Sequence, residues 1–227
     1  MAVSVQKRVN RILEEFDKRY GTEASTYLEH DASKAWQLLF ATILSAQCTD
    51  ARVNMVTKDL YRKYSDIKAF ADADPGELEQ DIHSTGFYHS KARNIIASAK
   101  ILTEKYGGNI PDTLEELTKL PGVGRKTANL MLSQFFGQDA IVVDTHVGRI
   151  SRKLGLTKAE DPAKVEADLM KLLPRDHWSA FNVQGIAFGR TICKAPRPKC
   201  GECYLADICP SCEAAVRPKK RKVNVWL

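Results

Sequence analysis

A glycine-rich turn followed by two cations is the first feature of this sequence that could support chemistry. The turn has the sequence LPGVG at residues 120–124, and Arg125 and Lys126 follow it directly. Glycine permits positive φ angles and close approach of another backbone. The N–H groups that begin a helix lack partners within it and, with the helix dipole, can hold a phosphate oxygen. A tight connection between packed helices can have the same glycines, so the turn alone does not identify a ligand.

Lys126 occupies a position where a lysine could become a nucleophile. At about 100° per residue it lies roughly 200° round the helix from the apolar Ala128, so it points away from the buried side. A free lysine, with a pKa of about 10.4, is nearly all protonated at neutral pH. The positive end of a helix disfavours the added proton, and a lysine with a lowered pKa can form a Schiff base. Most lysines at such positions are merely solvated.

Five cysteines near the end of the chain predict a metal site. Cys193, Cys200, Cys203 and Cys209 have the spacing C-x6-C-x2-C-x5-C, and an overlapping set replaces Cys193 with Cys212. In a reducing compartment such a group is more typical of a metal site than of disulfides. Because zinc and iron–sulfur clusters both bind thiolates, the ligand type leaves both metals open.

A carboxylate lies in the segment VDTH at residues 143–146. On the residues alone, Asp144 is interpreted as the N-cap of a helix that begins at Thr145. A cap and a chemical role can coexist on one carboxylate, since capping uses one oxygen. His146 is interpreted as a support for the geometry of the site.

Helices must position these groups, since apolar residues recur at three- and four-residue steps and no sustained strand alternation is found. The fold class is therefore predicted as all-α. We expect Asp50 to cap a helix that buries Val53, Val56 and Leu60. Thr113 and Glu116 have the spacing of a capping box, which predicts a helix that stops before Pro121; the next helix is expected to begin near Arg125. Asp161-Pro162 predicts another helix start.

Composition restricts the class of protein only loosely. The chain has 227 residues, 44% of them hydrophobic, and a formal net charge of +6. Its pI of about 8.9 is compatible with a polyanionic partner, although many basic proteins bind no nucleic acid. No apolar run is long enough to span a bilayer and the first residues lack a signal-peptide core, so an intracellular, cytoplasmic protein is expected. We also expect the chain to act as a monomer.

In combination, LPGVGRKTAN, VDTH and the first cysteine spacing resemble the endonuclease III branch of the helix-hairpin-helix DNA glycosylases. The resemblance covers nearly the whole chain up to Cys209. It implies two helical domains: a barrel with the helix-hairpin-helix motif at 28–138, and a discontinuous cluster domain at 1–27 and 139–212. Residues 213–227 form a basic tail, interpreted as a DNA-binding arm. The cofactor implied is a [4Fe–4S] cluster on Cys193, Cys200, Cys203 and Cys209, with Cys212 a spare thiol and Cys48 a packed apolar residue.

The resemblance also implies an activity on double-stranded DNA that contains damaged bases or abasic sites. Lys126 would attack C1′ of a flipped-out nucleotide, and Asp144 would stabilise the cationic sugar. Base loss would leave an imine, and β-elimination would then break the strand on the 3′ side. Oxidised pyrimidines are the family's usual lesions. The alternatives are a monofunctional mismatch glycosylase, which lacks the lysine, a non-catalytic iron–sulfur DNA-binding protein, or an electron carrier.

The resemblance also implies DNA contacts at further positions of this sequence. The resemblance implies that Gln47 fills the gap left by the flipped nucleotide and that Phe87 is an apolar wedge, which would offset part of the unstacking energy. The simpler interpretations are a helix-ending glutamine and a core phenylalanine. The loop 194–199 carries three cations that are expected to face no nearby acid and could neutralise phosphates. The full set of expected DNA-contacting residues is Gln47, Phe87, Gly122, Gly124, Arg125, His146, Lys194, Arg197 and Lys199.

Overall fold

The chain folds as two helical units in a computed structural model that describes residues 4–23 and 26–212. One unit runs from Ser25 to Ala140, and the other combines Met1–Ala24 with Ile141–Leu227. The described residues contain helices and no strand, which confirms the all-α prediction. None of the described helices is long and apolar enough to cross a membrane. The basic tail predicted at 213–227 lies outside the described residues.

The unit from Ser25 to Ala140 is built around α2 (Ala35–Leu44). This helix is apolar on every side, and all of its residues after the first are buried. A helix of this kind must be surrounded by other elements. It contacts α3 (Asp50–Lys63), α6 (Tyr88–Tyr106) and α8 (Arg125–Gln134).

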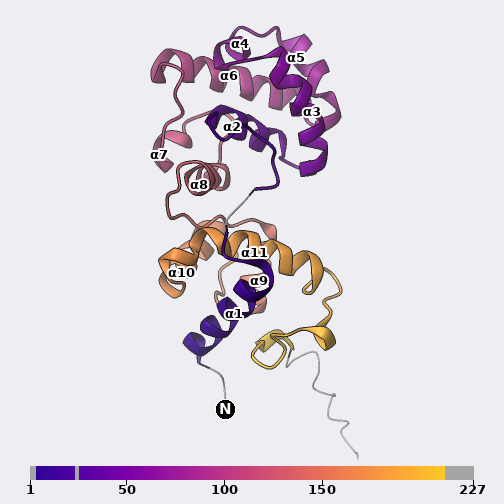
Figure 1. Cartoon of the computed structure of the whole chain (residues 1–227), viewed down its shortest axis with the longest axis vertical. Coiled ribbons are helices and arrows are strands. Elements are labelled where there is room, and N and C mark those ends of the chain that lie inside the picture. The colour runs from indigo at the N-terminus through magenta and orange to yellow at the C-terminus, as the bar shows by residue number, and fades with distance from the viewer. Residues whose placement is uncertain (1–3, 24–25, 213–227) are drawn as a thin grey trace, which may run out of the picture. The chain divides into compact units, whose positions relative to one another are not determined.

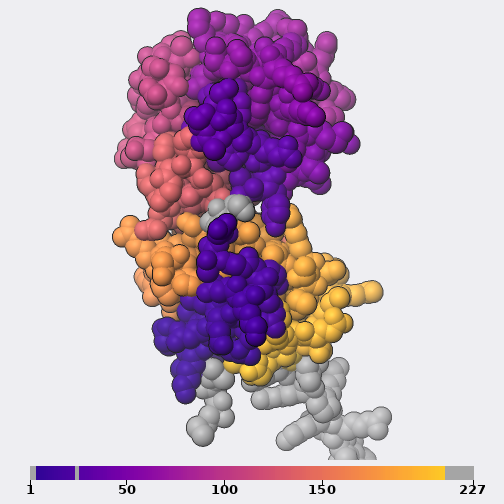
Figure 2. Space-filling model, viewed as in Figure 1, coloured from indigo at the N-terminus to yellow at the C-terminus, as the bar shows by residue number. Residues whose placement is uncertain are grey.

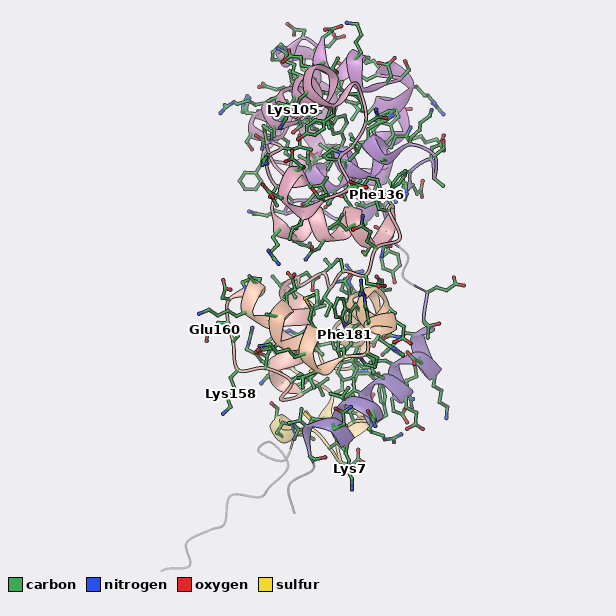
Figure 3. All side chains as sticks on the ribbon, turned by 90° about the vertical axis from the view of Figure 1, so that its left-hand side faces the viewer. Lys7, Lys105, Phe136, Lys158, Glu160 and Phe181 are labelled. Carbon is green, nitrogen blue, oxygen red and sulfur yellow. The ribbon has the colours of Figure 1, made fainter. Side chains whose placement is uncertain are left out.

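Two short helices, α4 (Ile67–Ala71) and α5 (Pro75–Ile82), pack along the long α6, and the single turn η1 (His83–Thr85) connects α5 to it (Figure 1). Phe70 of α4 also packs against α2, with its ring centroid 4.9 Å from that of Phe40 in an edge-to-face arrangement. Phe136, labelled in Figure 3, is half-buried against the same core.

Local capping sets where several helices begin, and in one case the prediction is wrong. Thr49, rather than the predicted Asp50, is the N-cap of α3, and its hydroxyl accepts a hydrogen bond from the Arg52 N–H. Asp50 is instead the first helical residue, where its charge suits the positive end of the helix. Both residues are good caps, so the sequence alone did not separate them. The start predicted at Asp161-Pro162 is confirmed, with Asp161 as the N-cap of α10 (Pro162–Leu172).

The other unit joins the beginning of the chain to its later part. It contains α1 (Val5–Tyr20), α9 (Thr145–Lys153), α10, η2 (Arg175–His177), α11 (Trp178–Thr191) and η3 (Cys200–Glu202). The contact of α11 with both α1 and α9 forms its centre. Phe181, labelled in Figure 3, is fully buried there beside Phe16 and Phe188. In Figure 2 the indigo atoms of α1 accordingly lie against the orange and yellow atoms of residues much later in the chain.

Candidate active site

The glycine-rich turn lies between α7 (Leu114–Leu117) and α8, as the sequence predicts. Thr113 caps α7 by accepting a hydrogen bond from the Glu116 N–H. Leu120 and Val123 are buried on either side of the turn, and the Val123 N–H donates to the Leu120 carbonyl at 3.0 Å. These contacts fix both ends of the turn in the core, while Gly122 and Gly124 are exposed.

Contacts from α6 hold the middle of the turn. The Ser98 hydroxyl donates to the Pro121 carbonyl at 2.8 Å. Gly122 has a φ of 79°, in the region that favours glycine. A Cβ atom at Gly122 would lie 3.0 Å from both Cβ and Nδ2 of Asn94, so the backbone of the turn lies directly against α6.

Replacing Gly122 with alanine is therefore expected to destabilise the fold. The positive φ alone costs of the order of 1–3 kcal/mol for a residue with a side chain, and the contact with Asn94 adds to that. Urea unfolding should show a lower midpoint at unchanged slope. The matched control is Gly124→Ala, because Gly124 has a φ of −89° and a Cβ there would meet nothing within 4 Å. If the two variants have the same urea midpoint, Asn94 and the turn do not constrain each other.

The start of α8 presents main-chain donors and a lysine. Gly124 is its N-cap and provides no side-chain hydrogen bond, so this end of the helix has no side-chain cap. Lys126, the second helical residue, is exposed, whereas Ala128 and Asn129 are buried on the other side of the helix. An exposed amine next to uncapped N–H groups can approach an anionic, electrophilic ligand.

Asp144 caps α9 in the other unit. Its Oδ1 accepts a hydrogen bond from the Val147 N–H at 2.8 Å, and the residue is half-buried. The preceding segment is held by Asn182 on α11, whose buried amide donates to the Val142 carbonyl at 2.9 Å. Since Asn182 comes 40 residues later, no local pattern in the sequence indicates this support.

His146 lies on the same face of α9 as Arg149 and close to α11. Its Nδ1 is 3.5 Å from Nη2 of Arg149. A Cβ atom at Gly189 would lie 2.8 Å from the same nitrogen, so a glycine is needed where the ring approaches α11. Arg149 also donates from Nη1 to the Cys193 carbonyl, which connects this helix to the cysteine-rich segment. Arg149 was not predicted from the sequence, although its position three residues after His146 places both on one helix face.

The two other predicted loop residues share an unusual backbone conformation. Gln47 and Phe87 have φ values of 53° and 50°, and they are the non-glycine residues with positive φ in the described part of the chain. Both are exposed, with 63% of the Phe87 surface accessible. The interpretation of Phe87 as a core residue is therefore wrong, and an exposed ring is available for contacts outside the chain.

The predicted cysteine ligands border one cavity. Cys193, Cys200, Cys203 and Cys209 line a space of about 100 Å³, and Cys212 lines it too. Burial raises the pKa of the thiols of Cys193 and Cys203, with smaller contributions from neighbouring groups. Among the described residues, no three cysteine, histidine or acidic side chains converge closely enough to hold a single metal ion. Cys48 lies in the other unit and packs against its apolar core, as expected.

The cationic loop before the last cysteines departs from the prediction in one respect. Lys194, Arg197 and Lys199 are all exposed. However, Lys199 pairs with Glu202 at 3.4 Å, so the expectation of three cations without an acid is wrong. Glu202 lies outside the loop, and η3 brings it back toward Lys199.

Comparison with known proteins finds matches over most of the chain. A family model described as "HhH-GPD superfamily base excision DNA repair protein" matches residues 40–175. The endonuclease III of Synechocystis sp. is 53% identical over 79% of this chain and 82% of its own length. The endonuclease III of Bacillus subtilis is 47% identical over 85% of this chain and 87% of its own.

Solved structures give the same result. A trapped covalent intermediate of an endonuclease III with DNA is 44% identical, with a TM-score of 0.87 over 95% of this chain and 100% of that one. A thermostable thymine-DNA glycosylase has a TM-score of 0.77 at 23% identity over 92% of this chain and 97% of that one, which shows a shared fold only.

Proposed function

This chain belongs to the endonuclease III family, within the HhH-GPD superfamily of base excision DNA repair proteins, and we propose that Lys126 and Asp144 carry its chemistry. The protein is a bifunctional enzyme, a DNA glycosylase with a lyase activity on abasic sites. The observation that carries the assignment of Lys126 is its exposed amine at the start of α8, directly after the uncapped glycine turn.

The turn and the start of α8 are proposed to hold the DNA backbone. Main-chain N–H groups and the positive end of the helix attract a phosphate, and Gly122 and Gly124 let the strand approach closely. The exposed Arg125 adds a charge that steers and anchors the backbone, and His146, Lys194, Arg197 and Lys199 are proposed to extend this contact. The substrate is double-stranded DNA with damaged bases or abasic sites.

With the backbone held, the Lys126 amine attacks C1′ of the flipped nucleotide as the bond between C1′ and the base breaks, and the base leaves with the bonding electrons. Positive charge develops on the sugar in this step, and the carboxylate of Asp144 is proposed to stabilise it. Loss of a proton from nitrogen and ring opening give an imine between Lys126 and C1′. Removal of a proton from C2′ then expels the 3′ phosphate, which breaks the strand.

Cleavage of a lesion panel tests this function. Duplexes with an oxidised pyrimidine such as thymine glycol, with a normal base pair and with an abasic site are incubated with the full chain. Strand breaks are expected at the oxidised pyrimidine and at the abasic site but not at the normal pair. Binding without breaks would make the chain a DNA-binding module, and base release without breaks would make it a monofunctional glycosylase.

The cysteine cavity is proposed to hold a [4Fe–4S] cluster. Four thiols that border a cavity, rather than converge on one point, suit a cluster in which each iron takes one protein ligand better than a single zinc ion. Cys193, Cys200, Cys203 and Cys209 would be the ligands. The cluster would act as a structural group that fixes the loop with Lys194 and Arg197.

Metal analysis checks the cluster. The purified protein is expected to be coloured and to contain iron and sulfide, and Cys203→Ser should lower the iron content sharply. Cys212→Ser is the matched control, since Cys212 is buried at the same cavity but is not among the proposed ligands. A colourless protein with zinc, or equal iron loss in both variants, would contradict the assignment.

A further inference from the structure

A buried lysine in α6 connects the two loops that carry Gln47 and Phe87. Lys91 is 3% exposed, and its Nζ donates to the Leu44 carbonyl at 2.8 Å and to the Thr85 carbonyl at 2.9 Å. Lysine is almost never fully buried unless its ammonium is paired. Here the two acceptors are main-chain oxygens, so the side chain joins two pieces of backbone.

The two carbonyls belong to the ends of two different elements. Leu44 is the last residue of α2, where helical carbonyls lack partners, and the Cys48 N–H bonds instead to the Ser45 carbonyl. Thr85 is the last residue of η1. Gln47 follows Leu44 by three residues and Phe87 follows Thr85 by two, so one ammonium fixes the points from which both loops depart.

Both loop residues need such support. A non-glycine residue with positive φ stores of the order of 1–3 kcal/mol and persists only where the surroundings hold it. Phe87 is the N-cap of α6 in a left-handed conformation without a side-chain cap, and its ring is 63% exposed, so its side chain gains little from packing. The backbone on either side must therefore hold it in place.

We propose that Lys91 is a positioning residue, which holds the loops of Gln47 and Phe87 at a fixed spacing so that both side chains enter the DNA together when a nucleotide flips out. This role rests on the proposed function. One residue that holds both loops suits this task, because the two inserted side chains together offset part of the energy of unstacking the base. Burial lowers the pKa of Lys91, since the charged form loses water that the two carbonyls replace only in part.

A double-mutant cycle tests the proposal. The variants are Lys91→Met, which keeps most of the volume but removes the donors, the pair Gln47→Ala with Phe87→Ala, and all three together. Single-turnover excision of an oxidised pyrimidine from a duplex is the first readout. Lys91→Met is expected to slow it about tenfold, yet change it less than twofold in the background that lacks both loop side chains.

A second readout separates positioning from a general loss of structure. On a single-stranded abasic oligonucleotide no opposite base must be separated, so borohydride trapping should be equal in Lys91→Met and the wild type. Lys100→Met is the control, because Lys100 is an exposed lysine on the same helix. If Lys91→Met does not fold, Lys91→Leu, which also removes the donors, takes its place in the cycle.

The outcomes distinguish the two proposals. If the wild type is active and Lys91→Met excises at the same rate, only the role of Lys91 is overturned. The same conclusion follows if Lys91→Met slows excision equally with and without the side chains of Gln47 and Phe87. A wild type that neither excises nor nicks would remove the proposed function, and the role of Lys91 with it.

Discussion

Lys126→Ala is expected to form no borohydride-trapped adduct with an abasic duplex, and its nicking rate should fall by about 10⁴-fold or more, as when a nucleophile is removed from other enzymes. The amine of Lys126 replaces the aldehyde oxygen at C1′, which leaves as water, and borohydride delivers hydride to the imine carbon. The product is a secondary amine that joins protein to DNA. Only a protein group that bonds to C1′ can form this trapped adduct.

Two properties of Lys126 make the variant informative. Its side chain is exposed at the start of α8, so truncation removes no packing contacts. The melting temperature should therefore stay within about 1 °C of the wild type. The backbone donors of the turn remain, so the variant should still bind an abasic duplex with an affinity within a few-fold of the wild type.

Lys58→Ala is the matched control for Lys126→Ala. Lys58 is an exposed lysine of α3 in the same unit, and its removal should leave both the adduct and nicking unchanged. A full-strength adduct in Lys126→Ala would assign the nucleophile to another amine. Loss of DNA binding together with loss of the adduct would make Lys126 an electrostatic contact instead.

Local chemistry explains why the hairpin could be predicted from the sequence. Pro121 cannot continue a helix, Thr113 and Glu116 mark the start of α7, and glycines 122 and 124 permit the turn, so α7 and α8 lie where the sequence placed them. Asp144 was recognisable as a cap for the same reason, because capping involves residues only three positions apart.

The supports of the site could not be predicted, since they join residues far apart in the chain. Asn182 holds the segment before Asp144, and Lys91 joins the ends of α2 and η1. A lone asparagine or lysine in a helix is usually solvated, and only tertiary packing makes it a buried donor. Lys199 has a different reason: its partner Glu202 is only three residues later, but the two side chains meet because of the turn η3, which the sequence pattern does not indicate.

Asp144→Asn is expected to keep the fold and lose most of the activity. Asparagine caps helices about as well as aspartate, so its amide oxygen can still accept from the Val147 N–H and the melting temperature should change little. The negative charge, however, is gone. Excision in single turnovers should fall by about 10²- to 10³-fold, the usual effect of removing one group that stabilises transition-state charge.

Two further variants separate the charge of Asp144 from its cap. Asp144→Ala should lose activity and also about 1 kcal/mol of stability, because both roles are removed. Asp161→Asn is the matched control, since Asp161 caps α10 in the same unit with the same geometry, its Oδ1 accepting from the Lys164 N–H at 3.0 Å. Asp161→Asn should change neither the excision rate nor the stability. The contrary outcome is that Asp144→Asn excises at the wild-type rate and Asp144→Ala is slowed only as far as its folded fraction falls. In that case Asp144 is a helix cap alone, and another group must stabilise the cation on the sugar.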